Sequence, residues 1–245
     1  MERRTLPAIL AFLVGAAAFC FASGSDVSVK TSDGWTLSSG GDGTTFYSRK
    51  RPGSSLKEFK AIGEIGAPTC TVHNVIDDFE AYPSFMPFIA ECRLIKRQAD
   101  SIVTYQRLSP RICCDRDYTL RVRESSWPRQ GGPVYLNRWE PANEFGPATK
   151  KGVIRVKICE GEWLLEPEDA TKTRATYTVY TDTGGAIPAV IANRASQIAI
   201  GRIFVAVRKQ VKNPKYSSSN CASARDSLNG SAFVPTFGGT DELKR

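Results

Sequence analysis

Few residues in this chain have the types and spacing that catalysis requires. His73 is the only histidine, and it falls in a segment with helical periodicity. The patterns of a nucleophilic serine (Gly-x-Ser-x-Gly), a phosphate-binding loop and a zinc-binding His-Glu-x-x-His are absent. Glu160, Glu162 and Glu166 share one face of a strand-like segment, which we expect to be hydrated because Trp163 has the opposite parity. The sequence therefore predicts no catalytic site.

The cysteines carry no metal signature. No Cys-x-x-Cys pair occurs, so we expect neither a metal nor a cofactor. Cys113 and Cys114 are adjacent and cannot bond each other without strain. In an oxidising compartment other pairs can form, and the sequence leaves the pairing open. The seven positions are Cys20, Cys70, Cys92, Cys113, Cys114, Cys159 and Cys221.

The N-terminus has the layout of a secretory signal. Two arginines precede an uncharged run rich in Leu, Ile, Val, Phe and Ala, which ends at Ser23 and Gly24. We expect residues 1–24 to be a signal peptide that is cut after Ala22 or Gly24. The run is also close to the length that spans a bilayer, so an uncleaved anchor is the alternative. In both cases we expect export to the periplasm or the extracellular space.

The basic charge is spread along the chain. The formal net charge is +8, yet the longest cationic run is Arg49-Lys50-Arg51. We interpret this as a solvated basic surface, with attraction to an anionic membrane surface as the functional alternative. Export makes nucleic acid an unexpected partner.

Hydrophobic periodicity predicts two helices and many strands. Pro68–Phe79 and the longer Ile187–Val211 have helical spacing, each with a proline near its start. The apolar face of the longer helix is expected to contain Val190, Ile191, Ile198, Ile203, Phe204 and Val207. Strands separated by turn residues are expected over Gly34–Leu37, Thr44–Arg49, Leu56–Ile65, Ala90–Arg97, Ser101–Leu108, Asp115–Glu124, Val134–Trp139, Gly152–Glu166 and Thr173–Thr181.

This order of elements is typical of an α+β protein with an antiparallel sheet. The final helix is the only predicted element long enough to cover one face of so large a sheet. A curved sheet that grips one helix encloses space, which becomes a ligand cavity if side chains do not fill it. We expect one domain over residues 25–216 and a disordered Ser- and Gly-rich tail over residues 217–245.

Several segments resemble START domains, the steroidogenic acute regulatory protein-related lipid transfer family. The resemblance lies in Asp33–Leu37, Phe46–Arg49 and Ser55–Ala61 (the opening of the domain), Asp115–Tyr118 (an arginine-aspartate-aromatic signature), Gly152–Lys157 (the strand after an omega loop), and Asp182–Gly185 followed by Ile187-Pro188 (the entry into the last helix). These matches run in the family's order from about Asp33 to Tyr216. The resemblance implies a helix-grip fold, in which a curved antiparallel sheet wraps a long C-terminal helix and encloses an apolar tunnel.

The same resemblance implies one bound lipid, such as a sterol, phospholipid or ceramide, carried without covalent chemistry. The last helix and the loop Pro141–Thr149 would form the lid. Burial of a lipid tail gains about 0.8 kcal/mol per CH₂, enough to extract it from a bilayer. Many members keep a buried arginine six positions beyond the signature arginine, where this chain has Val122. That departure argues against a charged headgroup.

Strand parity selects residues that would line the tunnel. Tyr118, Leu120 and Val122 form the more apolar face of their strand, which we expect to point inward. Choline-binding members of the family build an aromatic cage. Two of its positions match Tyr105 and Tyr118, but the third is Cys159, so phosphatidylcholine is not favoured.

Arg107 shares a face with Tyr105 and is a candidate headgroup partner, with solvent exposure or a carboxylate partner as the alternative. For the tyrosines, core packing is the alternative. For Arg116 and Asp117, a structural ion pair or turn anchor is preferred to a ligand role. The expected cavity-lining residues are Tyr105, Arg107, Tyr118, Leu120, Val122, Cys159, Gly161, Trp163, Tyr180, Ile191, Ala195 and Ile198.

The sequence thus predicts a protein that binds and transfers a single lipid or other hydrophobic ligand in an internal tunnel outside the cytoplasm. One alternative is a helix-grip enzyme of the polyketide cyclase or aromatase kind, because a fold alone does not decide function. The other is a membrane-tethered lipid sensor. The expected partners are the lipid and, transiently, a membrane surface, and the protein is expected to be a monomer.

Overall fold

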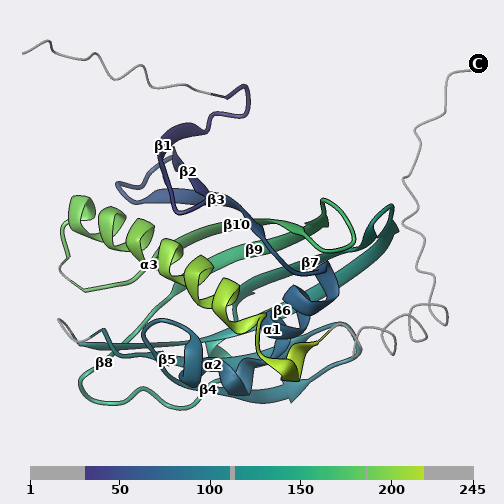
Figure 1. The fold of residues 1–245 in the computed structure, drawn as a ribbon. Coiled ribbons are helices and arrows are strands. Elements are labelled where there is room, and N and C mark those ends of the chain that lie inside the picture. Colours follow the sequence, from purple (N-terminus) through teal and green to yellow (C-terminus); the bar gives the residue numbers. More distant parts are fainter. Residues whose placement is uncertain (1–30, 111–113, 186, 218–245) are drawn as a thin grey trace, which may run out of the picture.

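The computed structural model describes residues 31–110, 114–185 and 187–217. Within these residues, ten strands form one sheet (Figure 1). The expected signal peptide and the expected tail beyond Ser217 lie outside this part of the chain. In spatial order the strands are β1 (Thr36–Gly41), β2 (Thr44–Lys50), β3 (Lys57–Ile65), β10 (Thr173–Asp182), β9 (Ile158–Pro167), β7 (Gly132–Pro141), β6 (Asp115–Arg129), β5 (Ile102–Leu108) and β4 (Ile89–Arg97), with β8 (Val153–Arg155) beside β6.

All strand pairs are antiparallel except β6 with β8. The helical segments are α1 (Thr69–Asp77), η1 (Phe79–Ala81), α2 (Tyr82–Phe85), η2 (Asn143–Phe145), α3 (Ala189–Gln210) and η3 (Pro214–Tyr216). Figure 1 shows the sheet bending around α3, so that β3 and β10 lie above this helix and β4 and β5 below it. The predicted α+β class, with a curved antiparallel sheet and a long C-terminal helix, is confirmed.

Local turn chemistry explains the first hairpin. Asp42 and Gly43 connect β1 to β2, and both have positive φ angles, 51° and 65°. A two-residue loop with both central residues in the left-handed region matches the right-handed twist of the strands that it joins. Asp followed by Gly is a favoured pair for such a loop, because glycine adopts this conformation without a steric penalty.

The expected single strand over Gly152–Glu166 is wrong. The structure divides it into β8 and β9, which pair with different neighbours. β8 runs parallel to the start of β6, where Arg155 lies opposite Asp117. The Val156 N–H then donates to the Asp117 carbonyl, after which the chain crosses to pair with β7 and β10. The break therefore occurs where Arg155 pairs with the distant residue Asp117, and local strand propensity does not predict it.

We call the sheet face that α1 and α3 cover the inner face, and the opposite side the outer face. The inner face is packed with aromatic side chains. The Trp163 ring lies 4.6 Å from the Tyr177 ring and 5.3 Å from the Phe204 ring of α3. On α1, Val72 and Val75 are fully buried in the same core. This core holds α1 and the C-terminal half of α3 to the sheet.

The predicted apolar face of α3 is only partly right. Phe204 and Val207 are fully buried, but Ile191 is 60% and Ile198 48% exposed. With 3.6 residues per turn, Ile191 and Ile198 lie about a third of a turn or more around the helix from Phe204. Apolar residues therefore occur on both sides of α3. By length and composition this helix could also cross a membrane, a test that core helices of soluble domains pass as well.

Candidate functional site

The inner face brings together six of the expected cavity-lining residues. On β6, Leu120 and Val122 are buried in the core and Tyr118 packs against it. On the same face of β9 lie Cys159, Gly161 and Trp163. Gly161 permits a close contact here, because a Cβ would lie 2.6 Å from the Trp139 indole and 2.2 Å from the Thr178 carbonyl. The alternation on these two strands therefore places these side chains as expected.

Tyr105 and Arg107 lie on the outer face instead. In the β5–β6 register, Tyr105 is opposite Thr119 and Arg107 is opposite Asp117. The Tyr105 hydroxyl donates to Asp117 Oδ2 at 3.2 Å. Because Tyr118 points to the inner face, the two expected cage tyrosines stand on opposite sides of the sheet. A shift of one residue along a strand reverses the face, so parity on β5 could not be inferred from β6.

Arg107 is paired with carboxylates, which was the alternative to a headgroup role in the sequence analysis. Its Nη1 lies 2.5 Å from Asp115 Oδ2 and its Nε 3.3 Å from Glu91 Oε2. The hydrogen bond that Arg107 donates to Asp115 raises the pKa of the Arg107 guanidinium. An arginine engaged by two carboxylates on the outer face is not available to a ligand on the inner face.

Four further expected residues also point away from the inner face. Tyr180 is on the outer face of β10, where the Arg51 guanidinium lies 4.2 Å from its ring centre and its hydroxyl donates to Ser54 Oγ at 3.0 Å. Ile191, Ala195 and Ile198 are on the exposed side of α3. The cause is the same for both elements: each has apolar residues on two faces, and packing selects one of them.

Arg116 and Asp117 have structural roles. Arg116 donates to the carbonyls of Cys114 at 2.6 Å and Thr183 at 3.2 Å, which ties the start of β6 to the segment before α3. Asp117, 1% exposed, accepts two hydrogen bonds from Arg155 at 2.7 and 3.0 Å. The preferred interpretation as anchors fits these contacts, although the partner of Asp117 is Arg155 and not Arg116.

The loop that was expected to act as a lid packs beside β6. Asn143 Oδ1 accepts from the Thr119 N–H at 2.9 Å, and Asn143 Nδ2 donates to the Val156 carbonyl at 2.8 Å. Gly146 packs on Thr119, where a Cβ would lie 2.0 Å from the threonine hydroxyl. Arg155 also donates to the Pro147 carbonyl at 2.9 Å. These contacts hold the loop firmly in place in this structure.

Sequence reasoning missed a set of polar side chains on the inner face. Tyr118 donates from its hydroxyl to Gln106 Oε1 at 3.0 Å. Thr104 and Asn137 are 0% and 3% exposed, and their side-chain oxygens lack a hydrogen-bond partner in the described chain. The only available signal was the alternation of residues along β5. Because β5 has polar residues on both faces, that alternation does not show which side chains point inward.

Burial favours the neutral forms of two thiols and two tyrosine hydroxyls on this inner surface. It raises the pKa of the Cys92 thiol to about 12 and that of the Cys159 thiol to about 11. Burial likewise raises the pKa of the Tyr118 and Tyr177 hydroxyls. All four groups therefore retain their protons at neutral pH.

The single histidine is a packing residue at one end of the inner face. The His73 ring stacks on Tyr135 with ring centres 4.1 Å apart, and its Nε2 lies 2.5 Å from Glu124 Oε1. Nearby, Asp77 lines a small pocket of about 220 Å³ together with Glu124 and Arg97. Burial, with repulsion from Glu124, raises the pKa of Asp77.

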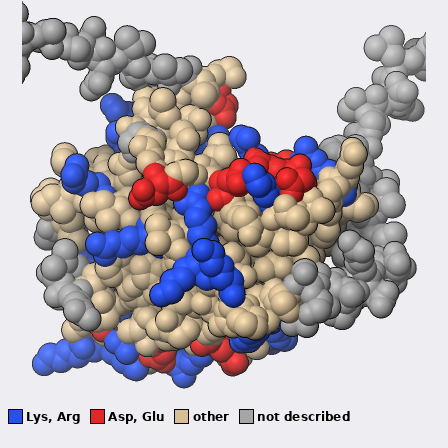
Figure 2. All heavy atoms as spheres, viewed as in Figure 1, with Lys and Arg blue, Asp and Glu red and all other residues tan. Residues whose placement is uncertain are grey.

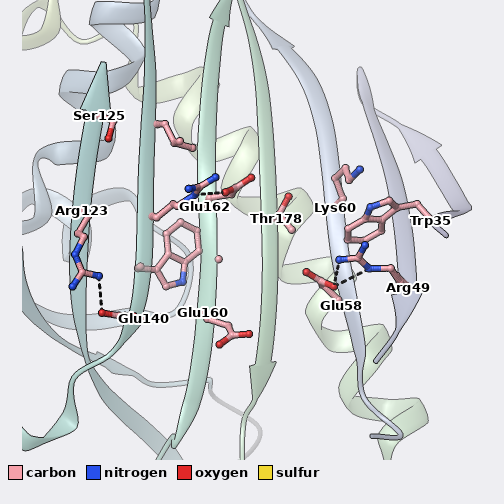
Figure 3. Close-up of a pocket in the computed structure, with 14 residues that line it drawn as sticks. Trp35, Arg49, Glu58, Lys60, Arg123, Ser125, Glu140, Glu160, Glu162 and Thr178 are labelled. Carbon is pink, nitrogen blue, oxygen red and sulfur yellow. Dashed lines mark hydrogen bonds and ion pairs between the residues drawn. The ribbon is translucent and has the colours of Figure 1, made fainter. Parts of the chain in front are cut away.

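The outer face carries a groove of about 730 Å³ that the sequence did not predict (Figure 3). Ion pairs between neighbouring strands line it, with α3 on the other side of the sheet. The pairs are Arg49–Glu58 at 2.7 Å, Arg123–Glu140 at 2.7 Å and Arg138–Glu162 at 2.8 Å, and Glu160 pairs with Arg51. The hydrated face expected for Glu160 and Glu162 is this outer face.

Residues 65–204 match the family described as polyketide cyclase/dehydrase and lipid transport. The chain belongs to this family. The sequence-based resemblance to START domains is confirmed by solved structures. A STAR-related lipid transfer protein from Xanthomonas axonopodis is 26% identical with a TM-score of 0.65, and the match covers 74% of this chain and 100% of that one.

This family member is also similar to a human protein of known structure and to a bacterial protein. Human StAR-related lipid transfer protein 5 shares the fold, with a TM-score of 0.64 at 16% identity over 74% of this chain and 88% of that chain. An uncharacterised protein of Pseudomonas aeruginosa is 29% identical over 160 residues, which cover 65% of this chain and 77% of the relative.

The family description covers both enzymes and lipid carriers. In this family member, the middle of the inner face offers apolar surface and neutral hydrogen-bonding groups. Such a surface can bury a hydrophobic ligand and orient it through hydrogen bonds. The charged groups of the inner face stand at its ends, where Arg116 and Glu124 are engaged with other parts of the chain.

Proposed function

We propose that this protein binds one hydrophobic ligand between the inner face of its sheet and α3, and that it carries this ligand between membranes without covalent chemistry. The observation that carries the proposal is the uncharged central inner face, built around Leu120, Val122 and Trp163. Each CH₂ of a lipid tail that leaves water for such a surface gains about 0.8 kcal/mol. The name of the Xanthomonas relative, a lipid transfer protein, supports the same function.

The ligand enters where α3 is attached most weakly. From residue 189 to residue 199, only Ala192 is buried, whereas Ile200, Phe204 and Val207 bury the second half of the helix. Because the core around Trp163 and Phe204 is packed, a ligand must displace part of α3. The N-terminal half of α3 moves at the lower cost, since it gives up fewer buried contacts.

The exposed side of α3 suits contact with a bilayer. Ile191 and Ile198 are exposed on it, next to the exposed cations Arg194 and Arg202. Figure 2 shows Lys and Arg side chains in the middle of this face of the molecule. Apolar residues between cations favour the interface of an anionic membrane. Transient membrane contact would place the movable helix at the source of the lipid.

We propose that the protein acts outside the cytoplasm, with residues 25–216 as the working domain. The signal-like sequence of residues 1–24 supports export. Cys70 is disulfide-bonded, and disulfides persist in oxidising compartments. Cys92, Cys114 and Cys159 are free thiols, whereas Cys20, Cys113 and Cys221 lie outside the described residues.

Native mass spectrometry of protein purified from its own compartment tests this function. We expect a population whose mass exceeds that of the polypeptide by one lipid, and extraction of that lipid should identify it. A homogeneous ligand-free mass, together with no binding to a panel of lipids, would contradict the carrier function. Conversion of the bound molecule into a product during incubation would favour the enzyme alternative.

A further inference from the structure

On the inner face, neutral hydrogen-bonding groups lie in the middle and charged groups lie toward the ends. In its middle, the polar side chains are hydroxyls, thiols and amides. On β6, the strand that crosses this face, the charged inner positions are Arg116 near the start and Glu124 toward the end. Arg116 donates to the Cys114 and Thr183 carbonyls, and Glu124 contacts His73. A ligand seated between them meets dipoles and no free charge.

Three of the neutral groups form a compact cluster on β5 and β6. Gln106 and Tyr118 are directly opposite in the strand register, and the tyrosine hydroxyl donates to the amide oxygen at 3.0 Å. The Gln106 amide retains two N–H donors beside that bond. Thr104 is two residues before Gln106, so its side chain is on the same face of β5. We call Thr104, Gln106 and Tyr118 the neutral subsite.

Thr104 provides an independent sign of a ligand. Its side chain is 0% exposed, and its hydroxyl oxygen has no partner among the described residues. A buried hydroxyl without a hydrogen bond destabilises the folded state, so such groups are uncommon in native cores. A ligand that bonds to this hydroxyl removes the penalty on binding.

A charged headgroup would find no counterion at the neutral subsite. Arg107, next along β5, points to the outer face and is paired with Asp115 and Glu91. The Arg–Glu pairs of the groove in Figure 3 are also on the outer face. A phosphate or carboxylate on the inner face would lose its hydration without an ion pair in return, which is strongly unfavourable.

We propose that the neutral subsite selects ligands with an uncharged hydrogen-bonding head, such as the hydroxyl or carbonyl of a neutral lipid, and rejects anionic and zwitterionic heads. The proposal rests on the proposed function, because it assumes that the inner face binds the hydrophobic part of the ligand. It adds the class of ligand and the residues that recognise its head.

The first test compares probes that share one decyl chain and differ in the head. Binding of decan-1-ol, decanoate and decylphosphocholine to the purified protein is measured by calorimetry, below micelle-forming concentrations and at about pH 8, where the carboxylate is ionised. We expect decan-1-ol to bind at least about tenfold more tightly than the other two, because only its head needs no counterion.

The second test removes the hydroxyl of Thr104 without changing its shape. Thr104→Val should weaken decan-1-ol binding about fivefold or more, leave the binding of naphthalene unchanged, and keep or raise the melting temperature, since an unpaired buried hydroxyl is lost. Gln106→Leu should also weaken decan-1-ol binding. Thr178→Val, on the outer face of β10, is the matched control and should change neither affinity.

The outcomes distinguish a failure of the proposed head selectivity from a failure of the proposed carrier function. Equal or tighter binding of decanoate or decylphosphocholine would overturn the head selectivity while leaving a hydrophobic carrier in place. Unchanged decan-1-ol affinity in Thr104→Val and in Gln106→Leu would overturn the assignment of the subsite. If neither the decyl probes nor naphthalene bound, and no lipid co-purified, the proposed function itself would fail.

Discussion

Asp117 has three hydrogen bonds to its buried carboxylate, two from Arg155 and one from Tyr105. The guanidinium engages both carboxylate oxygens, which is the strong, directional form of this pair. The hydrogen bonds with Asp117 raise the pKa of Arg155, so the guanidinium stays charged. Removing one partner would strand a buried charge, which costs about 3–5 kcal/mol in comparable pairs. Asp117 therefore has a structural role, because it ties β8 and β5 to the start of β6.

Leu120 is the residue at which we expect the ligand site to be most sensitive. It is 5% exposed on the inner face of β6. Leu120→Arg should abolish ligand binding in calorimetry with decan-1-ol, because a guanidinium there both fills apolar space and resists desolvation. The uncharged Leu120→Phe, which carries a smaller folding risk, should weaken binding about tenfold by overfilling the same space.

Ser125→Arg is the control for this pair of variants. Ser125 lies on the outer groove, on the same strand and exposed, so the added arginine should leave binding and melting unchanged. If Leu120→Phe folded with a normal melting temperature and wild-type affinity, the inner face would not be the ligand site.

At the scale of elements, α3 is attached differently along its length. At the C-terminal end, Arg208 donates to the carbonyls of Asp42, Gly43 and Glu64 at 2.7–2.8 Å. At the N-terminal end, Asn193 Oδ1 accepts from the Lys57 N–H at 2.9 Å, and Asn193 Nδ2 donates to the Ser55 carbonyl at 3.4 Å. The first attachment fixes the helix to the β1–β2 hairpin, and the second consists of exposed hydrogen bonds of one side chain, which open readily.

Asn193→Ala should therefore speed ligand exchange. Each of the two exposed hydrogen bonds that are lost contributes about 0.5–1.5 kcal/mol at most, so global stability should change little, while the N-terminal half of α3 lifts more often. Stopped-flow mixing with naphthalene, followed by tryptophan fluorescence, should give faster association and dissociation, each by about threefold or more.

Arg194→Ala provides the comparison, since Arg194 is the next residue on α3 and is exposed. Its exchange rates should equal those of the wild type. Identical exchange rates in Asn193→Ala and the wild type would mean that the ligand does not enter beneath this part of the helix.

Across the whole molecule, the two faces of the sheet carry different kinds of side chain. The outer face holds interstrand ion pairs that contact water, and the inner face holds the apolar core and neutral polar groups. Exposed ion pairs contribute little to stability but keep this face soluble and well ordered in register. The division leaves the inner face as the place where an apolar ligand can be shielded from water.

The disulfide at Cys70 leads to a prediction about the compartment. Cys70 is in α1, which packs on the inner face. Cys70→Ser should lower the free energy of unfolding by about 2–4 kcal/mol under oxidising conditions, because a disulfide restricts the unfolded chain. Thermal melts of wild type with and without reductant should show a loss of similar size.

Cys114→Ser is the matched control, because Cys114 is a free and exposed cysteine. It should melt as the wild type does, and reductant should lower its melting temperature equally. If reductant left the wild-type melting temperature unchanged, the disulfide would contribute nothing to the fold and would cease to support an exported protein.

Local sequence patterns were enough to predict the order of most elements and the inward faces of the regular strands. On β6 and β9 one set of alternate residues is clearly the more apolar, so Leu120 and Trp163 could be assigned to the core from local alternation alone. The Asp-Gly turn and the two prolines near helix starts are also local signals. Each depends on residues a few positions apart, which interact whatever the rest of the chain does.

Long-range packing and strand pairing set the faces of β5 and β10, the rotation of α3 and the break between β8 and β9. In the first two elements and in α3, apolar or aromatic residues occur on both sides, so pairing register and packing select which side is buried. The break follows from Arg155 meeting Asp117, which are 38 positions apart in the chain. Tyr105, Tyr180 and Ile198 therefore left the expected site, and Thr104 and Gln106 entered it, because long-range contacts outweigh local preference.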